Sequence, residues 1–295
     1  MKITLTGSLG HISRPLTQKL IKDGHDVTVV TSNPERQKEI EALGARAAVG
    51  TLEDVDFLTT TFTGSDAVYC MTPPQQFTEP DYALYGRRIG GHYATAIRQS
   101  GVGRVVNLSS WGAELDKGTG FILSSHQTEK MLNELQDVAM VHIRPTSFYY
   151  NLLGFIPMIK GAGFIAANYG DDDRLVLVAP EDISGAVAEE LVAGGSGRKV
   201  RYVASEETTC NEAARILGQH IGKPDLVWKR LTNEEMLAGL TANGVPGHIA
   251  GNLVELGEAS HKGLLRKGYE INKPPLGKVK LTDFAPAFAA AFNTK

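Results

Sequence analysis

The first thirteen residues, MKITLTGSLGHIS (residues 1–13), decide the fold. A short β-branched run, Lys2–Thr6, leads directly into Gly7 and Gly10 and then into a segment of helical pattern. A glycine-rich turn between a strand and a helix lets the backbone approach a pyrophosphate, and the N–H groups at the helix N-terminus favour its negative charge. Ser13 stands where a third glycine would be ideal, and its small side chain still allows the helix to pack closely on the strand. The pattern predicts a dinucleotide-binding turn rather than a purely structural one.

The residues after this turn continue to alternate between strand and helix patterns, which indicates a parallel sheet with helices on both faces. The candidate strands are residues 2–6, 26–31, 45–49, 66–70, 104–108 and 140–144. Parallel strands need crossover connections, nearly all of which are right-handed, so the simplest topology is doubly wound. We therefore expect an α/β fold, namely a Rossmann-like doubly wound parallel sheet with a smaller, mostly helical C-terminal substrate domain.

The second half of the chain has a looser pattern, which sets the expected domain boundary. Residues 1–150 should form the NAD(P)-binding Rossmann domain and residues 151–295 the substrate-binding part, with some segments of about 173–205 returning to the main sheet. Residues 151–172 combine glycines and a proline with apolar residues, a pattern typical of irregular structure around a pocket. Further helices are expected at residues 183–192, 211–221, 233–242, 251–257 and 281–292.

Composition and charge exclude several classes of protein. Of the 295 residues, 42% are hydrophobic and 21% are charged, which fits a globular protein rather than a disordered, collagenous or coiled-coil chain. The 30 Lys and Arg residues against 33 Asp and Glu residues give a net charge of -3, too near balance for direct nucleic-acid binding. Cys70 and Cys210 cannot form a disulfide framework, and no Cys/His cluster suggests a metal. With no targeting segment and no apolar run of about 20 residues, we expect a cytoplasmic protein without a membrane span.

The end of the second predicted strand bears on which nucleotide is bound. It reads VTSNPER (residues 30–36) and has no acid at its tip, where an NAD site usually places Asp or Glu against the ribose hydroxyls. Ser32, Asn33 and Arg36 could hold a 2′-phosphate instead, although Arg36 is also an ordinary surface cation in a first helical turn. We expect NADP as the cofactor, with NAD as the alternative.

A series of short motifs covers most of the chain. They are Gly7-x-x-Gly10, Asn33-Pro34, Gly44-Ala45, Thr72-Pro73-Pro74, Gly101-Val102, Leu108-Ser109-Ser110, Thr128-Glu129-Lys130-Met131-Leu132, Arg144-Pro145, Phe148, Asn151-Leu152 and Glu181-Asp182-Ile183. Their order and spacing resemble the NmrA-like branch of atypical short-chain dehydrogenases, which includes bacterial quinone oxidoreductases and isoflavone-reductase-like enzymes.

This resemblance implies a Rossmann domain that holds NAD(P) and a smaller C-terminal domain that closes over the nicotinamide. The family includes reductases and also redox-sensing regulators that bind the cofactor without turnover. Two positions depart from its pattern: Ser32 stands where a 2′-phosphate-binding Arg is common, and Gly50-Thr51 replaces a Gly-Asp pair. The first departure weakens the expectation of NADP, and the second removes one common contact to the adenine side.

The residues expected to contact the cofactor lie in the glycine turn and at the ends of later strands. They are Gly7, Leu9, Gly10, His11, Ile12, Ser32, Asn33, Arg36, Met71, Thr72, Pro73 and Ser109. His11 could either reach a phosphate or face solvent. Met71, Thr72 and Pro73 follow the fourth strand and should touch the ribose or nicotinamide side of the cofactor.

The candidate proton donor is a histidine. Typical short-chain dehydrogenases use a Tyr-x-x-x-Lys pair on a helix with a Ser at the preceding strand end, and here the tyrosine is absent. His126 takes its place four residues before Lys130, and residues so spaced share a helix face. Imidazole titrates near neutrality, so His126 and Lys130 are the candidate catalytic residues. The alternatives are a capping role for His126 and a solvated Lys130.

Four aromatic residues follow strands in the region where open α/β sheets bind ligands. Trp111, Phe148, Tyr149 and Tyr150 could stack on a planar quinone or other aromatic substrate. The alternative is that one or more of them packs the domain junction, which is the better explanation for Phe148. The leading function is therefore an NAD(P)H-dependent oxidoreductase that transfers hydride to a quinone or other small conjugated acceptor. The alternative is a non-catalytic NAD(P)-binding redox sensor of the NmrA type. An isomerase or epimerase is disfavoured because Tyr-x-x-x-Lys is lacking, and the oligomeric state stays open.

Overall fold

The chain folds into two compact units in the computed structural model, which describes residues 1–74 and 78–294. Unit 1 consists of Met1–Ala113, Ile122–Arg144 and Ile183–Arg201, and unit 2 of Glu114–Phe121, Pro145–Asp182 and Tyr202–Lys295. Each unit therefore combines segments that are distant in the sequence. The expected boundary at residue 150 divides the chain once, whereas the chain crosses between the units several times.

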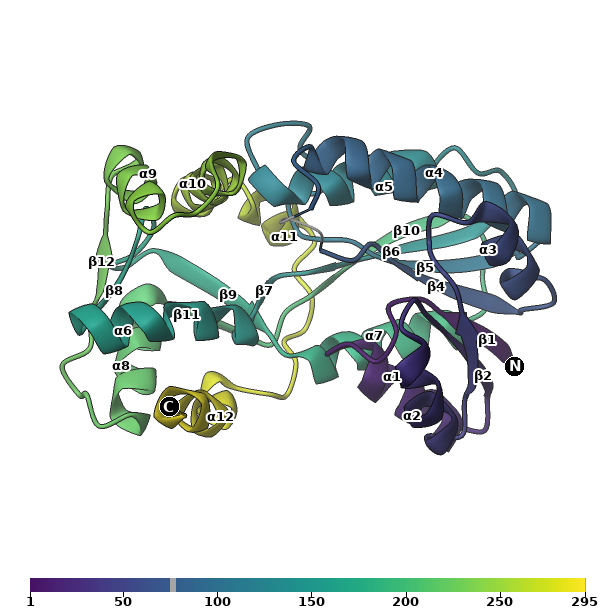
Figure 1. The fold of residues 1–295 in the computed structure, drawn as a ribbon, viewed down its shortest axis with the longest axis horizontal. Coiled ribbons are helices and arrows are strands. Elements are labelled where there is room, and N and C mark those ends of the chain that lie inside the picture. Colours follow the sequence, from purple (N-terminus) through teal and green to yellow (C-terminus); the bar gives the residue numbers. More distant parts are fainter. Residues whose placement is uncertain (75–77, 295) are drawn as a thin grey trace. The chain divides into compact units, whose positions relative to one another are not determined.

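Unit 1 is built on a seven-stranded sheet of order β10-β6-β5-β4-β1-β2-β3 (Figure 1). Its strands are β1 (Lys2–Leu5), β2 (Asp26–Thr31), β3 (Arg46–Val49), β4 (Ala67–Met71), β5 (Arg104–Leu108), β6 (Ala139–Pro145) and β10 (Arg198–Val203). Strand β1 pairs in parallel with both β2 and β4, and β4, β5 and β6 continue the parallel pairing. The strand order reverses direction between β1 and β4, which is where a doubly wound sheet binds its ligand. The predicted α/β fold and six of its strands are confirmed.

Helices cover both faces of this sheet (Figure 1). Helices α1 (Ser13–Lys22), α2 (Gln37–Ala42) and α7 (Pro180–Val192) lie on one face, and α3 (Val55–Phe62), α4 (Tyr82–Ser100) and α5 (Leu123–Leu132) on the other. Helices α4 and α5 pack closely because α4 has glycines at the contact. A Cβ on Gly86 would lie 2.2 Å from the carbonyl oxygen of Ser124, and one on Gly90 would lie 2.9 Å from Thr128 Cα.

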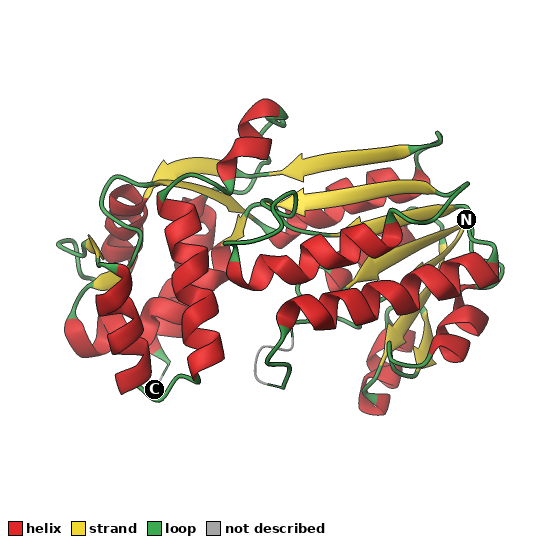
Figure 2. Cartoon of the chain, turned by 90° about the horizontal axis from the view of Figure 1, so that it is seen from above, coloured by secondary structure: helices red, strands yellow, loops and turns green. Residues whose placement is uncertain are grey.

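Unit 2 contains mostly helices with short strands between them (Figure 2). The strands form a three-stranded sheet of order β11-β9-β7 and a parallel pair, β12-β8. They are β7 (Ser147–Phe148), β8 (Ile165–Ala167), β9 (Arg174–Val178), β11 (Glu206–Thr209) and β12 (Trp228–Arg230). The helices are α6 (Ile156–Ala162), α8 (Cys210–His220), α9 (Asn233–Ala242), α10 (Gly247–His261), α11 (Arg266–Ile271) and α12 (Leu281–Asn293). Short 3₁₀ turns lie at Pro34–Arg36, Gly120–Ile122 and Tyr149–Phe155.

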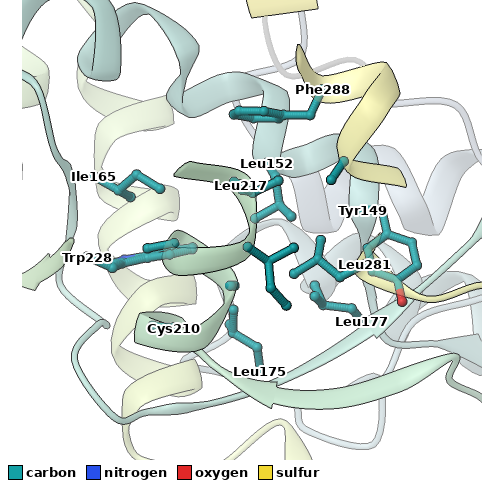
Figure 3. Close-up of a cluster of buried hydrophobic side chains, with 14 of the residues drawn as sticks. Tyr149, Leu152, Ile165, Leu175, Leu177, Cys210, Leu217, Trp228, Leu281 and Phe288 are labelled. Atoms are coloured by element: carbon teal, nitrogen blue, oxygen red, sulfur yellow. The ribbon is translucent and has the colours of Figure 1, made fainter. Parts of the chain in front are cut away.

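An apolar cluster of buried side chains lies within unit 2 (Figure 3). Trp228 and Phe288, both fully buried, pack with Leu175, Leu177 and Leu217 from the short sheet and α8. The indole Nε1 of Trp228 donates to the carbonyl oxygen of Tyr169 at 3.0 Å, so its one polar group is satisfied inside the core.

The structure differs from the sequence expectation in two segments. The sequence pattern predicts irregular structure for residues 151–172, whereas the structure has part of a 3₁₀ turn, helix α6 and strand β8 there. Helix α6 ends at Gly163, which has the left-handed conformation (φ 80°) that only glycine adopts easily. Within residues 173–205, α7 and β10 do return to the main sheet, whereas β9 pairs with β7 and β11 instead. An apolar run in the sequence predicts a strand, but it does not predict which other strand that strand pairs with.

Among residues 1–74 and 78–294, no helix is both long enough and apolar enough to cross a lipid bilayer. The same residues hold no group of three or more His, Cys, Asp or Glu side chains placed to bind a metal ion. Cys70 and Cys210 are buried free thiols. Burial raises the pKa of both thiols above its ordinary range, so neither is a reactive thiolate at neutral pH.

Candidate functional site

The turn between β1 and α1 requires glycine at its first position. Gly7 has φ +92°, in the left-handed region, and a Cβ there would lie 2.6 Å from Met71 Cε and 2.9 Å from Ser13 Oγ. Ser8, the next residue, also has a positive φ of 54°. Two successive residues in this region turn the backbone sharply, so the loop is open to a ligand on its outer side while its inner side packs against β4.

The backbone donors of this loop fit an anionic group. Ser8 N–H donates to the carbonyl oxygen of Val30 at 3.0 Å and Gly10 N–H to that of Gly7 at 3.3 Å. Within the described parts of the chain, no carbonyl accepts from the N–H of Leu9 or Ile12, although both residues are buried. Buried N–H groups normally have a partner, and the first turn of α1 carries no acidic side chain that would compete with a phosphate. The residues present therefore fit a dinucleotide pyrophosphate.

A buried hydrogen-bond network fixes the end of β4 beside the loop. The backbone N–H of Met71 donates to Thr6 Oγ1 at 2.9 Å, and Thr6 Oγ1 in turn donates to the carbonyl oxygen of Tyr69 at 3.1 Å. The hydroxyl of Tyr93, from α4, lies 2.7 Å from the carbonyl oxygen of Met71. Burial raises the pKa of Tyr93 well above its ordinary value, so it stays a neutral donor. Next along the chain, Thr72 Oγ1 lies 3.2 Å from Thr128 Oγ1, and Thr72 and Pro73 are half-buried.

The residues expected to choose the nucleotide lie together after β2. Ser32 is exposed and Arg36 is half-buried, so both are accessible. Asn33 has a second task, because its Oδ1 accepts a hydrogen bond from Glu35 N–H at 2.9 Å and caps the 3₁₀ turn. Nearby, Arg14 forms an ion pair with Glu39. His11 is exposed at the outer side of the glycine loop.

His126 is half-buried and Lys130 is exposed on α5. The Nδ1 atom of His126 lies 2.9 Å from the carbonyl oxygen of Ala113. A carbonyl only accepts hydrogen bonds, so Nδ1 carries a proton in this contact and Nε2 is the ring atom that can exchange one. Helix α5 thus carries the imidazole of His126, oriented by this hydrogen bond, and one turn later the exposed ammonium group of Lys130.

Sequence reasoning missed a buried ion pair next to Ser109. Arg144, at the end of β6, donates to Glu129 on α5 through Nε at 2.9 Å and through Nη2 at 2.7 Å. Ser109 Oγ, directly after β5, donates to the same carboxylate at 2.5 Å. The signal was present in the sequence, because an Arg inside an apolar strand needs an acidic partner when it is buried.

Burial by itself would raise the pKa of Glu129, because it penalises the charged carboxylate. The hydrogen bonds and charge of Arg144, together with the hydrogen bond from Ser109, outweigh that effect and lower the pKa below its usual value. Glu129 is therefore ionised at neutral pH. An opening of about 410 Å³ beside it is lined by Asn133, His142, Arg144, Arg198, Lys199 and Val200.

The four aromatic residues expected to contact the substrate lie in different surroundings. Trp111 is buried in unit 1. In unit 2, the rings of Phe148 and Tyr150 stack with centroids 4.9 Å apart, and both are half-buried. Tyr149 is 1% exposed, and its hydroxyl lies 3.1 Å from the carbonyl oxygen of Val279, so it is part of the apolar cluster of unit 2 (Figure 3).

Comparison with known proteins agrees with this geometry. Residues 7–154 match the NAD(P)H-binding family. The chain belongs to this family. The match begins at Gly7 and contains the glycine loop with Tyr69, Met71 and Tyr93 of the network beside it, and NAD(P)H is the cofactor of the family. The NAD(P)H-binding family that the glycine turn predicts is thereby confirmed.

Individual relatives of this NAD(P)H-binding chain are reductases. A (4-alkanoyl-5-oxo-2,5-dihydrofuran-3-yl)methyl phosphate reductase of Streptomyces griseus is 29% identical over 223 residues, which are 75% of this chain and 74% of that protein. An NAD(P)H azoreductase of Xenophilus azovorans is 22% identical over 99% of both chains. The crystal structure of an NADPH-dependent quinone oxidoreductase of Escherichia coli, complexed with NADPH, superposes with a TM-score of 0.81 at 20% identity, covering 99% of this chain and 100% of the other. The chain thus shares its NAD(P)H-binding family and its fold with proteins that are reductases.

Proposed function

We propose that the protein reduces a quinone or another small conjugated acceptor with NADPH. The observation that carries this proposal is the loop at Gly7, where among the described residues no carbonyl accepts from the N–H groups of Leu9 and Ile12, in a chain with reductases among its relatives. When bound, the nicotinamide cofactor supplies the hydride, and the reduced acceptor takes up a proton from a protein group or from water. The remaining task of the chain is to hold both molecules and to exclude water.

The proposal assigns the candidate residues to the cofactor, to the proton or to the acceptor. The N–H groups of Leu9 and Ile12 bind the pyrophosphate, Gly7 and Gly10 let the backbone approach it, and His11 lies beside them in the chain. Met71, Thr72 and Pro73 line the ribose and nicotinamide side. His126 gives a proton from Nε2 to the acceptor, and Lys130 raises the local positive potential. Trp111 in unit 1, and separately the stacked pair of Phe148 and Tyr150 in unit 2, are the candidate rings for contact with a planar acceptor. Tyr149 belongs to the apolar core of unit 2 instead.

The preference for NADPH over NADH is argued from the β2 end. No acid stands at its tip, and Ser32 and Arg36 are both accessible there. A guanidinium recognises a phosphate by charge-assisted hydrogen bonds, so Arg36 is the residue that would select the 2′-phosphate. Ser32 directly follows Thr31, the last residue of β2, whose Oγ1 accepts a hydrogen bond at 2.9 Å from Ser8 Oγ in the glycine loop.

A second function, that of a cofactor sensor without turnover, is favoured by one feature: the helix lacks the Tyr-x-x-x-Lys pair, and Lys130 is exposed. Quinone reduction needs little acid catalysis, which is why we prefer the reductase. The deciding experiment measures consumption of NADPH and NADH by the purified protein across quinones, azo compounds and aromatic carbonyls, after binding of each cofactor has been titrated. Turnover at a rate above that of the protein-free mixture supports the reductase, and binding of NADPH without turnover on any acceptor supports the sensor.

A further inference from the structure

The buried trio of Ser109, Glu129 and Arg144 restricts what the Ser109 hydroxyl can do. Each of the three side chains is at most 8% exposed. Arg144 binds both carboxylate oxygens of Glu129, in the two-pronged geometry that holds the carboxylate as an anion. An ionised carboxylate has no proton to give and only accepts hydrogen bonds. The proton of Ser109 Oγ therefore points at Glu129 Oε1, 2.5 Å away.

A serine hydroxyl has one proton and two lone pairs. Since the proton is committed to Glu129, Ser109 Oγ can offer only a lone pair to any ligand. The backbone N–H of Ser109 is committed as well, because it donates to the carbonyl oxygen of Ile143 at 2.8 Å. A serine in this state cannot donate to a developing oxyanion on a substrate. It can accept from an N–H or O–H group.

The position of Ser109 indicates which ligand would make such a contact. The residue follows β5 at the carboxyl edge of the sheet, and β5 lies next to β4, whose Met71 pairs with Leu108. A dinucleotide bound at the switch point between β1 and β4 places its adenosine half towards β2. Its nicotinamide half then extends to the other side, towards the ends of β4 and β5. The donors on that half are the carboxamide NH₂ and the ribose hydroxyls.

We propose that Ser109 is a hydrogen-bond acceptor for the nicotinamide half of NADPH, held in that role by the Glu129–Arg144 pair, and is not a proton donor to the substrate. Ser109 contacts the cofactor, while Glu129 and Arg144 act through it as positioning residues. The proposal gives the pair a task that is separate from stability. In this role Ser109 accepts a hydrogen bond from the cofactor, whereas a serine that polarises a substrate carbonyl would donate one.

The test measures the Kd for NADPH by fluorescence titration, without any acceptor. One neutral hydrogen bond corresponds to roughly a 3- to 10-fold change in affinity, so Ser109→Ala should raise the Kd for NADPH by about that factor. Ser109→Thr keeps a hydroxyl and should restore most of the affinity. The control is Ser100→Ala, which removes a hydroxyl that donates to the carbonyl oxygen of Ile97 within its own helix and should leave the Kd unchanged.

Glu129→Gln tests the positioning step. An amide can donate as well as accept, so the Ser109 proton is no longer committed to it. We expect this variant to raise the Kd for NADPH about as much as Ser109→Ala does, and the double variant to be no weaker than either single one, because both act on one contact. Additive losses would overturn the positioning role. If circular dichroism shows that Glu129→Gln is unfolded, the Ala and Thr variants of Ser109 decide the proposal by themselves.

An unchanged Kd for NADPH in Ser109→Ala overturns the proposal. So does a loss of about 100-fold or more in kcat at saturating NADPH, which is the effect of removing a donor to an oxyanion. Because the titration needs no acceptor, a wild-type protein that binds NADPH but reduces nothing would contradict the proposed function and still test the role of Ser109.

Discussion

Arg144 Nη2 lies 2.7 Å from Glu129 Oε2, in a part of unit 1 where both side chains are almost completely buried. The pair joins the end of β6 to the buried face of α5, and through Ser109 it also reaches the end of β5. Three elements that approach one another at the carboxyl edge of the sheet are thus linked by one carboxylate. Removing either charge leaves the other one buried without a partner.

Arg144→Ala should lower the free energy of unfolding by about 3 to 5 kcal/mol, because it strands the Glu129 carboxylate in the interior. Urea unfolding followed by circular dichroism measures this loss. The matched control is Arg215→Ala, which breaks an exposed ion pair with Glu212 within one helix and should leave the midpoint nearly unchanged. Equal midpoint shifts in the two variants would contradict the argument.

The same pair predicts an acid dependence of stability. The folded-state pKa of Glu129 lies below its ordinary value, so the pair stabilises the fold at pH values above about 4.5 and this contribution is lost as the pH falls through the folded pKa. The unfolding free energy of the wild-type protein should therefore decline as the pH falls below about 4.5. Glu129→Gln should make that decline shallower, as measured by urea unfolding at each pH. A slope identical to that of the wild type would show that other carboxylates cause the decline.

Gly7→Ala should abolish binding of NADPH, because its Cβ would meet Met71 Cε and Ser13 Oγ at a backbone φ of +92°. Isothermal titration calorimetry measures the binding. Gly24→Ala is the control, since Gly24 has a similar φ of +83° but no atom within 4 Å of the added Cβ. It should cost about 1 kcal/mol in stability and leave binding intact. Retained NADPH affinity in a folded Gly7→Ala protein would refute the role of the loop.

His126→Ala should lower kcat by about 100-fold if its imidazole gives the proton, while the Kd for NADPH stays the same. Steady-state kinetics with a quinone acceptor tests this. His220→Ala serves as the control, because the His220 Nδ1 also lies 2.9 Å from a backbone carbonyl oxygen, that of Ile216, at the end of a helix in unit 2. Near-normal kcat in His126→Ala would mean that water supplies the proton.

Arg36→Ala should weaken NADPH about 10-fold and leave NADH almost unaffected, since only NADPH carries the 2′-phosphate that a guanidinium binds. The two Kd values, measured at low and at high salt, separate a phosphate contact from a general surface charge. Arg46→Ala, which removes an exposed cation paired with Asp26 at the amino ends of β3 and β2, away from the end of β2 that Arg36 follows, is the control. A parallel loss of NADH affinity in Arg36→Ala would remove Arg36 from the selection of the nucleotide.

The sequence alone determined the sheet of unit 1 and the place of the glycine loop. Local patterns suffice for this, because β-branched runs, a glycine turn and helix caps act over a few neighbouring residues. For the same reason the helix at Asn233–Ala242, which Thr232 caps with Glu235 three residues later, has the bounds that its pattern predicts.

Only the tertiary structure decided the rest. Strand β9 reads like a strand of the main sheet, yet it pairs with β7 and β11, since pairing depends on which partners the chain brings near. In the sequence, Glu129 and Arg144 are separate charges fifteen residues apart, and folding makes them one buried pair that accepts the proton of Ser109. Tyr149 and Tyr150 are neighbours of the same type, but one lies in the core and the other stacks on Phe148. Burial and charge pairing are properties of contacts between distant residues, and no local pattern contains them.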